Sequence, residues 1–371
     1  MILIFFLQIL ILIQGQYLSN VSTLAGNGSA SFADGMSMGS KFNDPVDLDV
    51  DTAGNTYIAD KNNHRIRKLT RGGVVSTLAG SGKASFADGT GTIASFDTPS
   101  GVVVDPAGNV YVADCYNSRI RKITPGGVVS TFYFWQPSYR CPKGLALDFM
   151  GNLWVSFKSQ NYFCKIKPDR TLSDFSSDIC SGKVIGLAVD NTGNIYFTET
   201  FSHRVCKMTP EGVISIIAGS GKGGFVNGLG ELASFNNPQD VTVDTGGNII
   251  VADSSNNCIR MVSPGGLVST LSGSGRNTFG DGEGIGASFY FPTGVVSVGS
   301  GGNQKIYVAD SLNNRVRVLS FSPCPAGNLC SNPISISTCP SGAYCPTGSF
   351  TSTPCKEVSI VCFFFFCTLQ A

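Results

Sequence analysis

The chain has 371 residues, of which only 14% are charged, and its formal net charge at pH 7 is +1. Its basic residues recur at intervals instead of clustering, which argues against the positive footprint that polyanion-binding proteins carry. We therefore expect no nucleic acid partner. The length is enough for one large domain and a small appendix.

The first sixteen residues form an almost purely apolar segment that ends in Gln14-Gly15-Gln16. The segment is short for a membrane span and fits the hydrophobic region of a secretory signal peptide. We predict a signal peptide over residues 1–16, cleaved after Gly15, and a secreted or cell-surface protein. Because a basic stretch before the apolar run is missing, an uncleaved anchor is the alternative.

Two glycosylation acceptor motifs follow the predicted signal peptide. They are Asn20-Val21-Ser22 and Asn27-Gly28-Ser29. Asparagine in this motif is glycosylated on the surface of secreted proteins. We predict both Asn20 and Asn27 as glycosylation sites, with Asn27 the better placed, at the mouth of a glycine-rich loop.

One sequence pattern recurs six times from about residue 21 to residue 320. Its clearest element is a short β-branched or aromatic run that ends in an acid, such as Tyr111-Val112-Ala113-Asp114, after a Gly-Asn turn. Each full copy holds four such runs separated by turn residues, and none has helical periodicity. In the second copy the runs are 101–104, 109–113, 119–123 and 128–131. Repeated four-stranded units without helices predict a β-propeller.

The count of strands predicts how the ring closes. The sixth copy supplies three clear strands before Phe321, and the N-terminus supplies an orphan strand over residues 21–26, which matches residues 75–80. Pairing of these segments would remove an exposed sheet edge. The predicted fold class is thus all-β: a six-bladed β-propeller over residues 17–320, closed by an N-terminal strand, plus a small disulfide-rich C-terminal segment.

The repeated residues resemble those of the NHL-repeat family. The resemblance rests on a Pro-x-Gly start, the Gly-Asn-x-Tyr-Val-Ala-Asp core and the Asn-x-Arg-Ile-Arg-Lys strand, and it covers about residues 21–320. The third copy departs most, because Phe163-Cys164-Lys165 stands where the second copy has Arg119-Ile120-Arg121. The resemblance implies a six-bladed propeller that usually acts as a binding platform, and a minority of relatives are enzymes.

Thirteen cysteines indicate an oxidising compartment. In the propeller, Cys115 follows the second strand of its blade and Cys141 precedes the first strand of the next, so the two are a possible staple between blades. A Cys141–Cys180 pair is the competing arrangement, and buried free thiols are the third.

The C-terminal part divides into a cysteine-rich module and a hydrophobic tail. Residues 321–357 carry little apolar content, so disulfides must hold them. The segment resembles the small modules of ephrin-receptor-like ectodomains, and a zinc site is the weaker alternative because no His is near. No role is assigned to residues 358–371. The candidate disulfide cysteines of the module are Cys324, Cys330, Cys339, Cys345 and Cys355.

The two histidines, His64 and His203, are the chain's only candidates for a histidine metal site. They come from blades opposite each other in the ring. The family resemblance implies that its lyases hold a metal with several histidines, and two histidines need an additional ligand. The alternative is that both fill a polar position occupied elsewhere by Ser118, Asn257 or Asn314. We expect no bound metal or cofactor.

An acidic residue ends the second strand in five of the six copies. These acids could form a ring of carboxylates that holds a cation, or each could accept local N–H bonds or pair with the nearby arginine, Arg65, Arg119, Arg204 or Arg315. Because the acids repeat with the fold, we favour the structural interpretation. They are Asp60, Asp114, Glu199, Asp253 and Asp310.

Four of the six joins between blades are long and share one motif. Each has a Phe-x-Asp/Asn-Gly element and then a second phenylalanine before a proline, whereas the two middle joins lack this insert. Loops on a rigid scaffold often bind partners, so we predict a binding face here; the alternative is that the phenylalanines plug gaps between blades. The candidate binding residues are Phe32, Asp34, Phe86, Asp88, Phe225, Asn227, Phe279 and Asp281.

Together these features predict a secreted or cell-surface binding platform without catalytic activity. Its expected partner is an extracellular protein, peptide or glycan, engaged through the long inter-blade loops. The competing hypothesis is an extracellular metal-dependent lyase or hydrolase with its site in the central channel.

Overall fold

The structure is a computed structural model that describes residues 17–136, 140–158, 160–176 and 182–323, together with four short strands between residues 328 and 354. The predicted signal peptide, the hydrophobic tail and Cys180, Cys324, Cys339, Cys345 and Cys355 lie outside the described residues. Cys330 lies in a described strand, but its side chain is not described.

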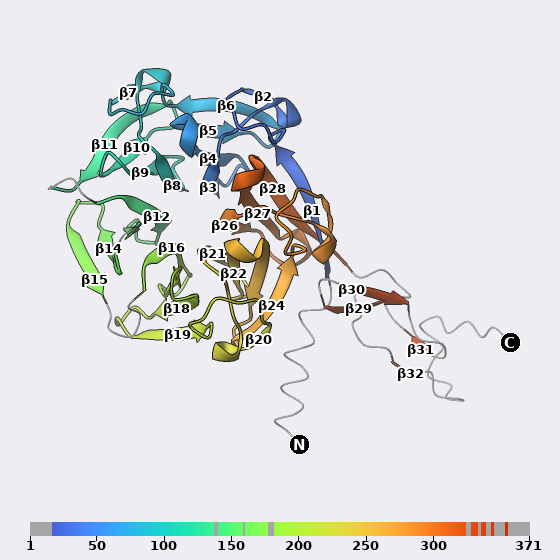
Figure 1. Cartoon of the computed structure of the whole chain (residues 1–371). Coiled ribbons are helices and arrows are strands. Elements are labelled where there is room, and N and C mark those ends of the chain that lie inside the picture. Colours follow the sequence, from blue (N-terminus) through green and yellow to red (C-terminus); the bar gives the residue numbers. More distant parts are fainter. Residues whose placement is uncertain are drawn as a thin grey trace.

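Six antiparallel sheets stand in a ring, as the sequence predicts (Figure 1). Each sheet is one blade, and its four main strands follow one another from the centre of the ring outward. Blade 1 contains β3 (Pro45–Val50), β4 (Thr56–Asp60), β5 (Arg65–Leu69) and β6 (Val74–Ala79), and blade 2 contains β8 (Pro99–Val104), β9 (Val110–Asp114), β10 (Arg119–Ile123) and β11 (Val128–Phe134). Blade 5 contains β21 (Pro238–Val243), β22 (Ile249–Asp253), β23 (Cys258–Val262) and β24 (Leu267–Ser272), and blade 6 contains β26 (Pro292–Val298), β27 (Lys305–Asp310), β28 (Arg315–Pro323) and β1 (Tyr17–Ala25). Blade 3 contains β12 (Pro142–Leu147), β13 (Leu153–Phe157), β14 (Tyr162–Ile166) and β15 (Leu172–Ser176), and blade 4 contains β16 (Val184–Val189), β17 (Ile195–Glu199), β18 (Arg204–Met208) and β19 (Ile214–Ala218).

The N-terminal strand closes the ring, which confirms the prediction. β1 pairs antiparallel with β28, from Tyr17 opposite Pro323 to Ala25 opposite Val316. Val21 and Ala25 are buried in this position. The first described strand therefore completes the last blade and covers its edge.

Four blades carry a fifth, two-residue strand that the sequence did not predict. Each comes from the long join that precedes its blade, pairs with the outermost main strand of that blade, and leads into a three-residue 3₁₀ helix. The inserts therefore reach the outer edge of the ring. They contain β2 (Gly35–Met36) with η1 (Ser37–Gly39), β7 (Gly89–Thr90) with η3 (Gly91–Ile93), β20 (Gly228–Leu229) with η4 (Gly230–Leu232), and β25 (Gly282–Glu283) with η6 (Gly284–Gly286).

The hydrophobic core lies within and between the blades. β4, β13, β17 and β22 are buried along their whole length, because both of their faces pack against a neighbouring blade. The innermost strands approach so closely that a Cβ atom on Gly101 or Gly144 would overlap a carbonyl oxygen of the next blade. Glycine is needed at these two positions because the backbones meet there.

The turns of each blade define two faces of the ring. We call the face with the inter-blade joins and the turns after the second strands the join face, and the opposite one the turn face. The turns after the second strands include η2 (Lys61–Asn63), η5 (Ser254–Asn256) and η8 (Ser311–Asn313), and one 3₁₀ turn, η7 (Gly301–Asn303), lies on the turn face before β27.

The C-terminal strands form two small sheets outside the ring (Figure 1). β29 (Asn328–Asn332) pairs with β30 (Ser335–Thr338), and β31 (Ala343–Tyr344) pairs with β32 (Thr353–Pro354). In the part of the chain that the structure describes, no helix has the length and apolar character needed to cross a membrane.

Candidate functional site

The first phenylalanine of each insert lies half-exposed on the join face. The exposed fraction is 42% for Phe32, 44% for Phe86, 54% for Phe225 and 43% for Phe279. The second phenylalanine of each insert is fully buried in a core cluster shared by its own blade and the preceding one, as the alternative interpretation expects for it. These buried residues are Phe42, Phe96, Phe235 and Phe289.

Both phenylalanines of an insert pack on one buried arginine. In blade 1 the guanidinium carbon of Arg67 lies 4.8 Å from the ring centroid of Phe32 and 5.2 Å from that of Phe42. Arg67 is completely buried. The repeated two-phenylalanine motif is therefore a clamp for a guanidinium. Its counterparts are Arg121 between Phe86 and Phe96, Arg260 between Phe225 and Phe235, and Arg317 between Phe279 and Phe289.

Hydrogen bonds complete this clamp. One terminal nitrogen of Arg67 donates to Asp60 Oδ2 at 2.6 Å and to the Lys41 carbonyl, and the other donates to Asp34 Oδ1 at 2.6 Å and to the Ala33 carbonyl. The insert thus supplies one carboxylate and two carbonyls, and the strand supplies the second carboxylate. Asp34 has a structural partner, although it keeps 44% of its side chain exposed. Asp88, Asn227 and Asp281 make the same contact with Arg121, Arg260 and Arg317.

In blades 1, 2 and 6 the arginine predicted to pair with the strand acid was the wrong one. Arg65 lies directly opposite Asp60 in the sheet register, yet Asp60 bonds to Arg67, which starts opposite Ile58 and reaches diagonally along the same face. The Arg65 guanidinium instead turns outward and donates to the Ser81 carbonyl of the next insert. Sequence reasoning missed the buried arginines, although the Arg-x-Arg spacing of the third strand was the available signal.

The strand acids do not form a solvent-facing ring of carboxylates. Asp60 is fully buried, and it accepts a backbone N–H from Asn43 besides the bonds from Arg67 and Asn63. Burial raises the pKa of Asp60, while the charge of Arg67 opposes that shift. Burial also raises the pKa of Asp114, to about 6. The structural interpretation of these acids is therefore the one the contacts support.

The two histidines occupy a repeated left-handed position on the join face. His64 and His203 have φ values of 50° and 55°, and the Nδ1 atom of each accepts a backbone N–H from the next blade, that of Thr98 or Asn237. Two asparagines do the same in other blades: Asn257 accepts from Phe291, and Asn314 accepts from Asp44. The histidines are thus interchangeable with asparagine as inter-blade acceptors. Within the described ranges, no three His, Cys, Asp or Glu side chains gather in a way that could hold a metal ion.

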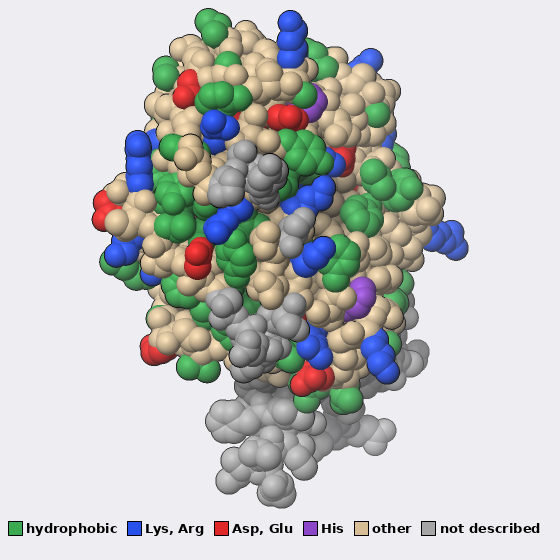
Figure 2. All heavy atoms as spheres, turned by 60° about the vertical axis from the view of Figure 1, so that its left-hand side comes forward, with side chains coloured by type: hydrophobic (Ala, Val, Ile, Leu, Met, Phe, Trp, Pro, Cys, Tyr) green, Lys and Arg blue, Asp and Glu red, His purple; other side chains and the backbone are tan. Residues whose placement is uncertain are grey.

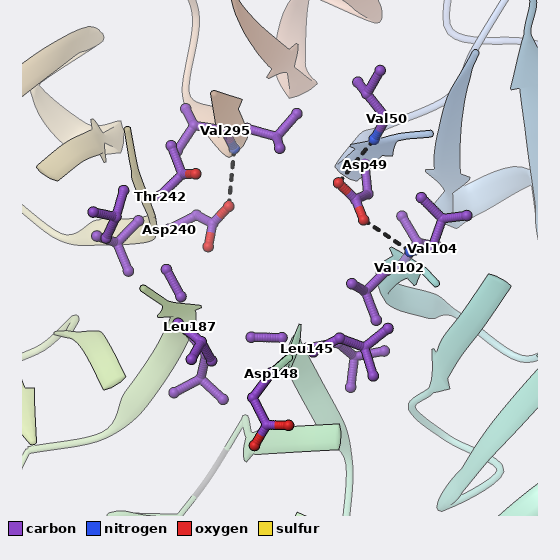
Figure 3. A pocket seen from close by; sticks show the side chains of 18 of the residues that line it. Asp49, Val50, Val102, Val104, Leu145, Asp148, Leu187, Asp240, Thr242 and Val295 are labelled. Carbon is purple, nitrogen blue, oxygen red and sulfur yellow. Dashed lines mark hydrogen bonds between the residues drawn. The ribbon is translucent and has the colours of Figure 1, made fainter. Parts of the chain in front are cut away.

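A cavity of about 440 Å³ lies in the central channel and reaches the turn face (Figure 3). Its wall is mostly aliphatic and comes from the innermost strands of all six blades. Asp49 and Asp240 point into the opening and each accepts a backbone N–H from the next blade, from Val104 and Val295 respectively. These carboxylates tie neighbouring blades together at the channel wall.

The channel carboxylates hold their protons more tightly than ordinary aspartates. Burial raises the pKa of Asp47 to about 7 and that of Asp49 to about 6. Burial, and then the charge of Asp47, raises the pKa of Asp240. A cavity with these groups could receive a small polar or cationic molecule. Sequence reasoning missed them because in most blades glycine or an aliphatic residue stands at the same positions.

The predicted cysteine staple has suitable geometry. The Sγ atoms of Cys115 and Cys141 lie at disulfide distance, with their Cα atoms 4.2 Å apart, at the join between blades 2 and 3. Cys164 and Cys258 are buried free cysteines. The predicted glycosylation residues are both exposed: Asn20 lies in β1, and Asn27 lies in the first insert.

Charged residues are dispersed on the side of the ring that Figure 2 presents. Lys and Arg side chains alternate there with hydrophobic and neutral ones and form no single basic patch. On this side the surface therefore lacks the footprint expected of a polyanion-binding protein.

Comparison with known proteins agrees with the fold. The NHL repeat family model matches residues 42–69, 96–123 and 235–260. Each matched segment runs from the end of an insert into the third strand of its blade. A curated relative, Protein SUPPRESSOR OF QUENCHING 1, chloroplastic, from Arabidopsis thaliana, is 44% identical over 73 residues, which are 19% of this chain and 7% of that protein.

Solved propellers resemble most of the chain in structure. A Bacteroides thetaiotaomicron protein of unknown function is 21% identical, with a TM-score of 0.69 over 83% of this chain and 77% of that one. An auxiliary nutrient binding protein of the same species is 18% identical, with a TM-score of 0.66 over 82% and 77%. Virginiamycin B lyase from Staphylococcus aureus is 13% identical, with a TM-score of 0.54 over 82% and 99%. At these identities the likeness concerns the fold: the chain is a six-bladed β-propeller, and three segments of it match the NHL repeat model.

Proposed function

We propose that this protein is a secreted or cell-surface binding platform without catalytic activity, which engages an extracellular protein, peptide or glycan on its join face. One solved propeller of the same fold is described as a nutrient binding protein, which is consistent with a binding role. The proposal places the partner on the four inserts.

The observation that carries this proposal is the set of four half-exposed phenylalanines, each packed on a buried arginine of its blade. Phe32 retains 42% of its surface while Arg67 fixes its position. An aromatic ring that is already immobilised loses little conformational entropy when a partner covers it. Four such phenylalanine side chains on a closed propeller make a rigid surface suited to recognition.

The extracellular part of the proposal comes from the N-terminal apolar segment, the cysteine content and the two acceptor motifs. Expression of the full chain through a secretory pathway should release a protein whose Asn20 and Asn27 carry glycans. Mass spectrometry before and after enzymatic deglycosylation measures this. A chain that is retained in the cytosol, or that is secreted with no glycan on Asn20 or on Asn27, would contradict the extracellular part of the proposal.

Binding can be tested with the full secreted chain on arrays of extracellular glycans and peptides. We expect a ligand whose capture is lost in the combined variant Phe32→Ser, Phe86→Ser, Phe225→Ser and Phe279→Ser. Phe149→Ser is the matched control, because Phe149 is 77% exposed on the opposite, turn face. Binding that survives the combined variant but fails in Phe149→Ser would move the site to the central cavity, which Phe149 lines. Absence of any ligand would contradict the platform.

A further inference from the structure

In three of the four inserts, a second arginine covers the exposed phenylalanine. The guanidinium carbon lies 3.9 Å from the ring centroid for Arg65 on Phe32 and 4.0 Å for Arg119 on Phe86. For Arg315 on Phe279 the distance is 3.7 Å. Such stacking of a guanidinium on an aromatic face is a favourable cation–π contact. In blades 1, 2 and 6, an arginine of the same blade therefore already occupies the exposed face of the phenylalanine side chain.

The covering arginine sits in a shaped slot between two inserts. Arg65 donates to the carbonyl oxygen of Asn63 at 3.1 Å and to that of Ser81, in the next insert, at 3.0 Å. A Cβ atom on Gly82 would overlap the guanidinium. The join between blades 6 and 1 repeats this arrangement, with Arg315 bonded to the carbonyls of Asn313 and Asn27 and lying against Gly28.

Blade 5 has the slot without the arginine. The equivalent residue is Cys258, whose short side chain is buried and cannot reach Phe225. Phe225 is 54% exposed, compared with 42–44% for the three covered phenylalanines. A Cβ atom on Gly275, the counterpart of Gly82, would meet only the Asn256 carbonyl oxygen, at 3.7 Å. The volume that a guanidinium fills in the other joins is thus open here.

This open volume is a cavity of about 460 Å³ between the inserts of blades 5 and 6. Phe225 and Ser274 line it, with Arg276, Thr278 and Ile285 around them. Asn256 and Ser274 are the counterparts in the repeat of Asn63 and Ser81, whose carbonyls receive Arg65. In the described part of the chain no side chain donates to the carbonyl of Asn256 or Ser274. The acceptors of the slot are in place.

The charges around the slot set the strength of binding. Asn227 replaces the aspartate of the other inserts, and Asp253 is already paired with Arg260, so the described residues that line the cavity include no free carboxylate. Arg276 stands exposed at its rim. A planar guanidinium can stack and donate to two carbonyls at once, whereas an ammonium group cannot do both in this geometry. The slot should therefore select arginine by shape, with modest affinity for a single side chain.

We propose that the space beside Phe225 is a guanidinium slot that receives an arginine side chain of the partner. This proposal rests on the proposed function, because it names a chemical feature of what the join face binds. The internal template is the join between blades 1 and 2, where the same contacts are made by Arg65.

The test uses the full chain, with acetyl-arginine amide as the probe and acetyl-lysine amide as its control, measured by ligand-observed NMR titration. We expect the arginine probe to bind about tenfold more tightly than the lysine probe. Cys258→Arg should fill the slot from within and abolish this binding. Arg65→Cys should open a second slot beside Phe32 and raise the stoichiometry from one to two.

Further variants keep the outcome decisive. If Cys258→Arg fails to fold, Phe225→Leu takes its place and should weaken binding about fivefold to tenfold. Arg276→Ala should bind equally or more tightly, because a competing cation leaves the rim. Equal binding of the two probes, unchanged binding in Cys258→Arg, or loss of binding in Arg276→Ala would overturn the slot.

The slot and the binding platform can fail separately. A partner captured equally by the wild type and Cys258→Arg would leave the platform standing and overturn the slot as its recognition element. Arginine-selective binding without any captured partner would support the slot and contradict the platform.

Discussion

In blades 1, 2, 5 and 6, one position of the third strand holds a fully buried arginine. Blades 3 and 4 have a cysteine at the same position. Blade 3 has Cys164 at this position, and Phe157 replaces the acid that ends the second strand of other blades. Blade 4 has Cys206 but keeps the acid, Glu199. The same two blades lack the insert and its fifth strand. The buried arginine and the insert therefore vary together within one chain, whereas the strand acid is lost in blade 3 and kept in blade 4.

The physical reason for this covariation is the cost of a buried charge. A guanidinium removed from water needs a counter-ion and acceptors for its donors. The insert supplies Asp34 and the carbonyls of Ala33 and Lys41 to Arg67. Without the insert those acceptors are absent, and a small uncharged cysteine is the tolerable residue. The long joins are thus part of the blade's internal structure as well as of its surface.

Aromatic packing takes over where the insert is missing. Around blade 3, Trp135 meets Phe157 edge to face at 5.1 Å, and Phe157 lies 5.4 Å from Tyr162. The guanidinium of Arg140 lies 5.3 Å from the Tyr162 ring. Cys115 and Cys141 meet at the same join. Blades with an insert are therefore held together by buried ion pairs, and the join around blade 3 by packed aromatic rings and a cysteine pair.

Removal of a buried arginine should produce the largest effect. Arg121→Leu leaves Asp114 and Asp88 without their cation, and we expect the free energy of unfolding to fall by about 3–5 kcal/mol. Urea denaturation of the full chain measures this. The double variant Arg121→Leu/Asp114→Leu should recover part of the loss, because both buried charges are gone. A loss under about 1 kcal/mol in the single variant would contradict the charge argument.

The cysteine pair should stabilise the join that lacks an insert. Cys115 and Cys141 are 26 residues apart in the chain, and a disulfide closing a loop of that size stabilises by about 3 kcal/mol in the chain-entropy treatment. Cys115→Ser/Cys141→Ser should lose about that much in urea denaturation, and a reductant should lower the stability of the wild type alone. Intact mass after thiol alkylation is the control: labelling of both cysteines in the folded wild type would refute the disulfide.

The channel wall distinguishes blade 1 from blade 3 in a second way, through pH. Blade 1 has Asp49, whose pKa burial raises to about 6, where blade 3 has Ala146. A raised pKa in the folded state favours folding below the unfolded pKa near 3.8, and this contribution is lost as pH rises through about 6. Through Asp49 alone, stability should fall by about 1 kcal/mol between pH 5 and pH 8, after a discount for the partial exposure of this group to water.

Asp49→Asn checks the origin of that pH dependence. The amide can still accept one backbone N–H bond and does not titrate, so we expect a flatter profile in denaturation experiments from pH 5 to pH 8. A slope equal to that of the wild type would assign the effect to other groups, with Asp47 and its pKa of about 7 as the first to examine.

The smallest effect should come from exchanging equivalent acceptors. His64→Asn places in blade 1 the residue that blade 5 has at Asn257, and both accept a backbone N–H of the next blade. The change in unfolding free energy should stay within about 0.5 kcal/mol. His64→Leu, which removes the acceptor, should cost about 1 kcal/mol. A large loss in His64→Asn would assign the histidine a role beyond this bond.

The sequence by itself determined the four main strands of the blades, the number of blades, the closing strand and the equivalence of the two histidines with asparagine. These features are local: alternation, turn residues and copied motifs each lie within about a dozen residues, and the repeat confirms each of them several times. The same locality explains why the repeated acids were correctly expected to be structural.

Only the tertiary structure decided which arginine each acid holds and what the inserts do. Arg67 reaches Asp34 across 33 positions of the chain and reaches Asp60 along a diagonal, while the residue opposite Asp60 in register is Arg65. Side-chain length and burial, which no local pattern reports, choose between these partners. The open slot beside Phe225 is likewise invisible in the sequence until the stacked arginines of the other joins show what Cys258 leaves unfilled.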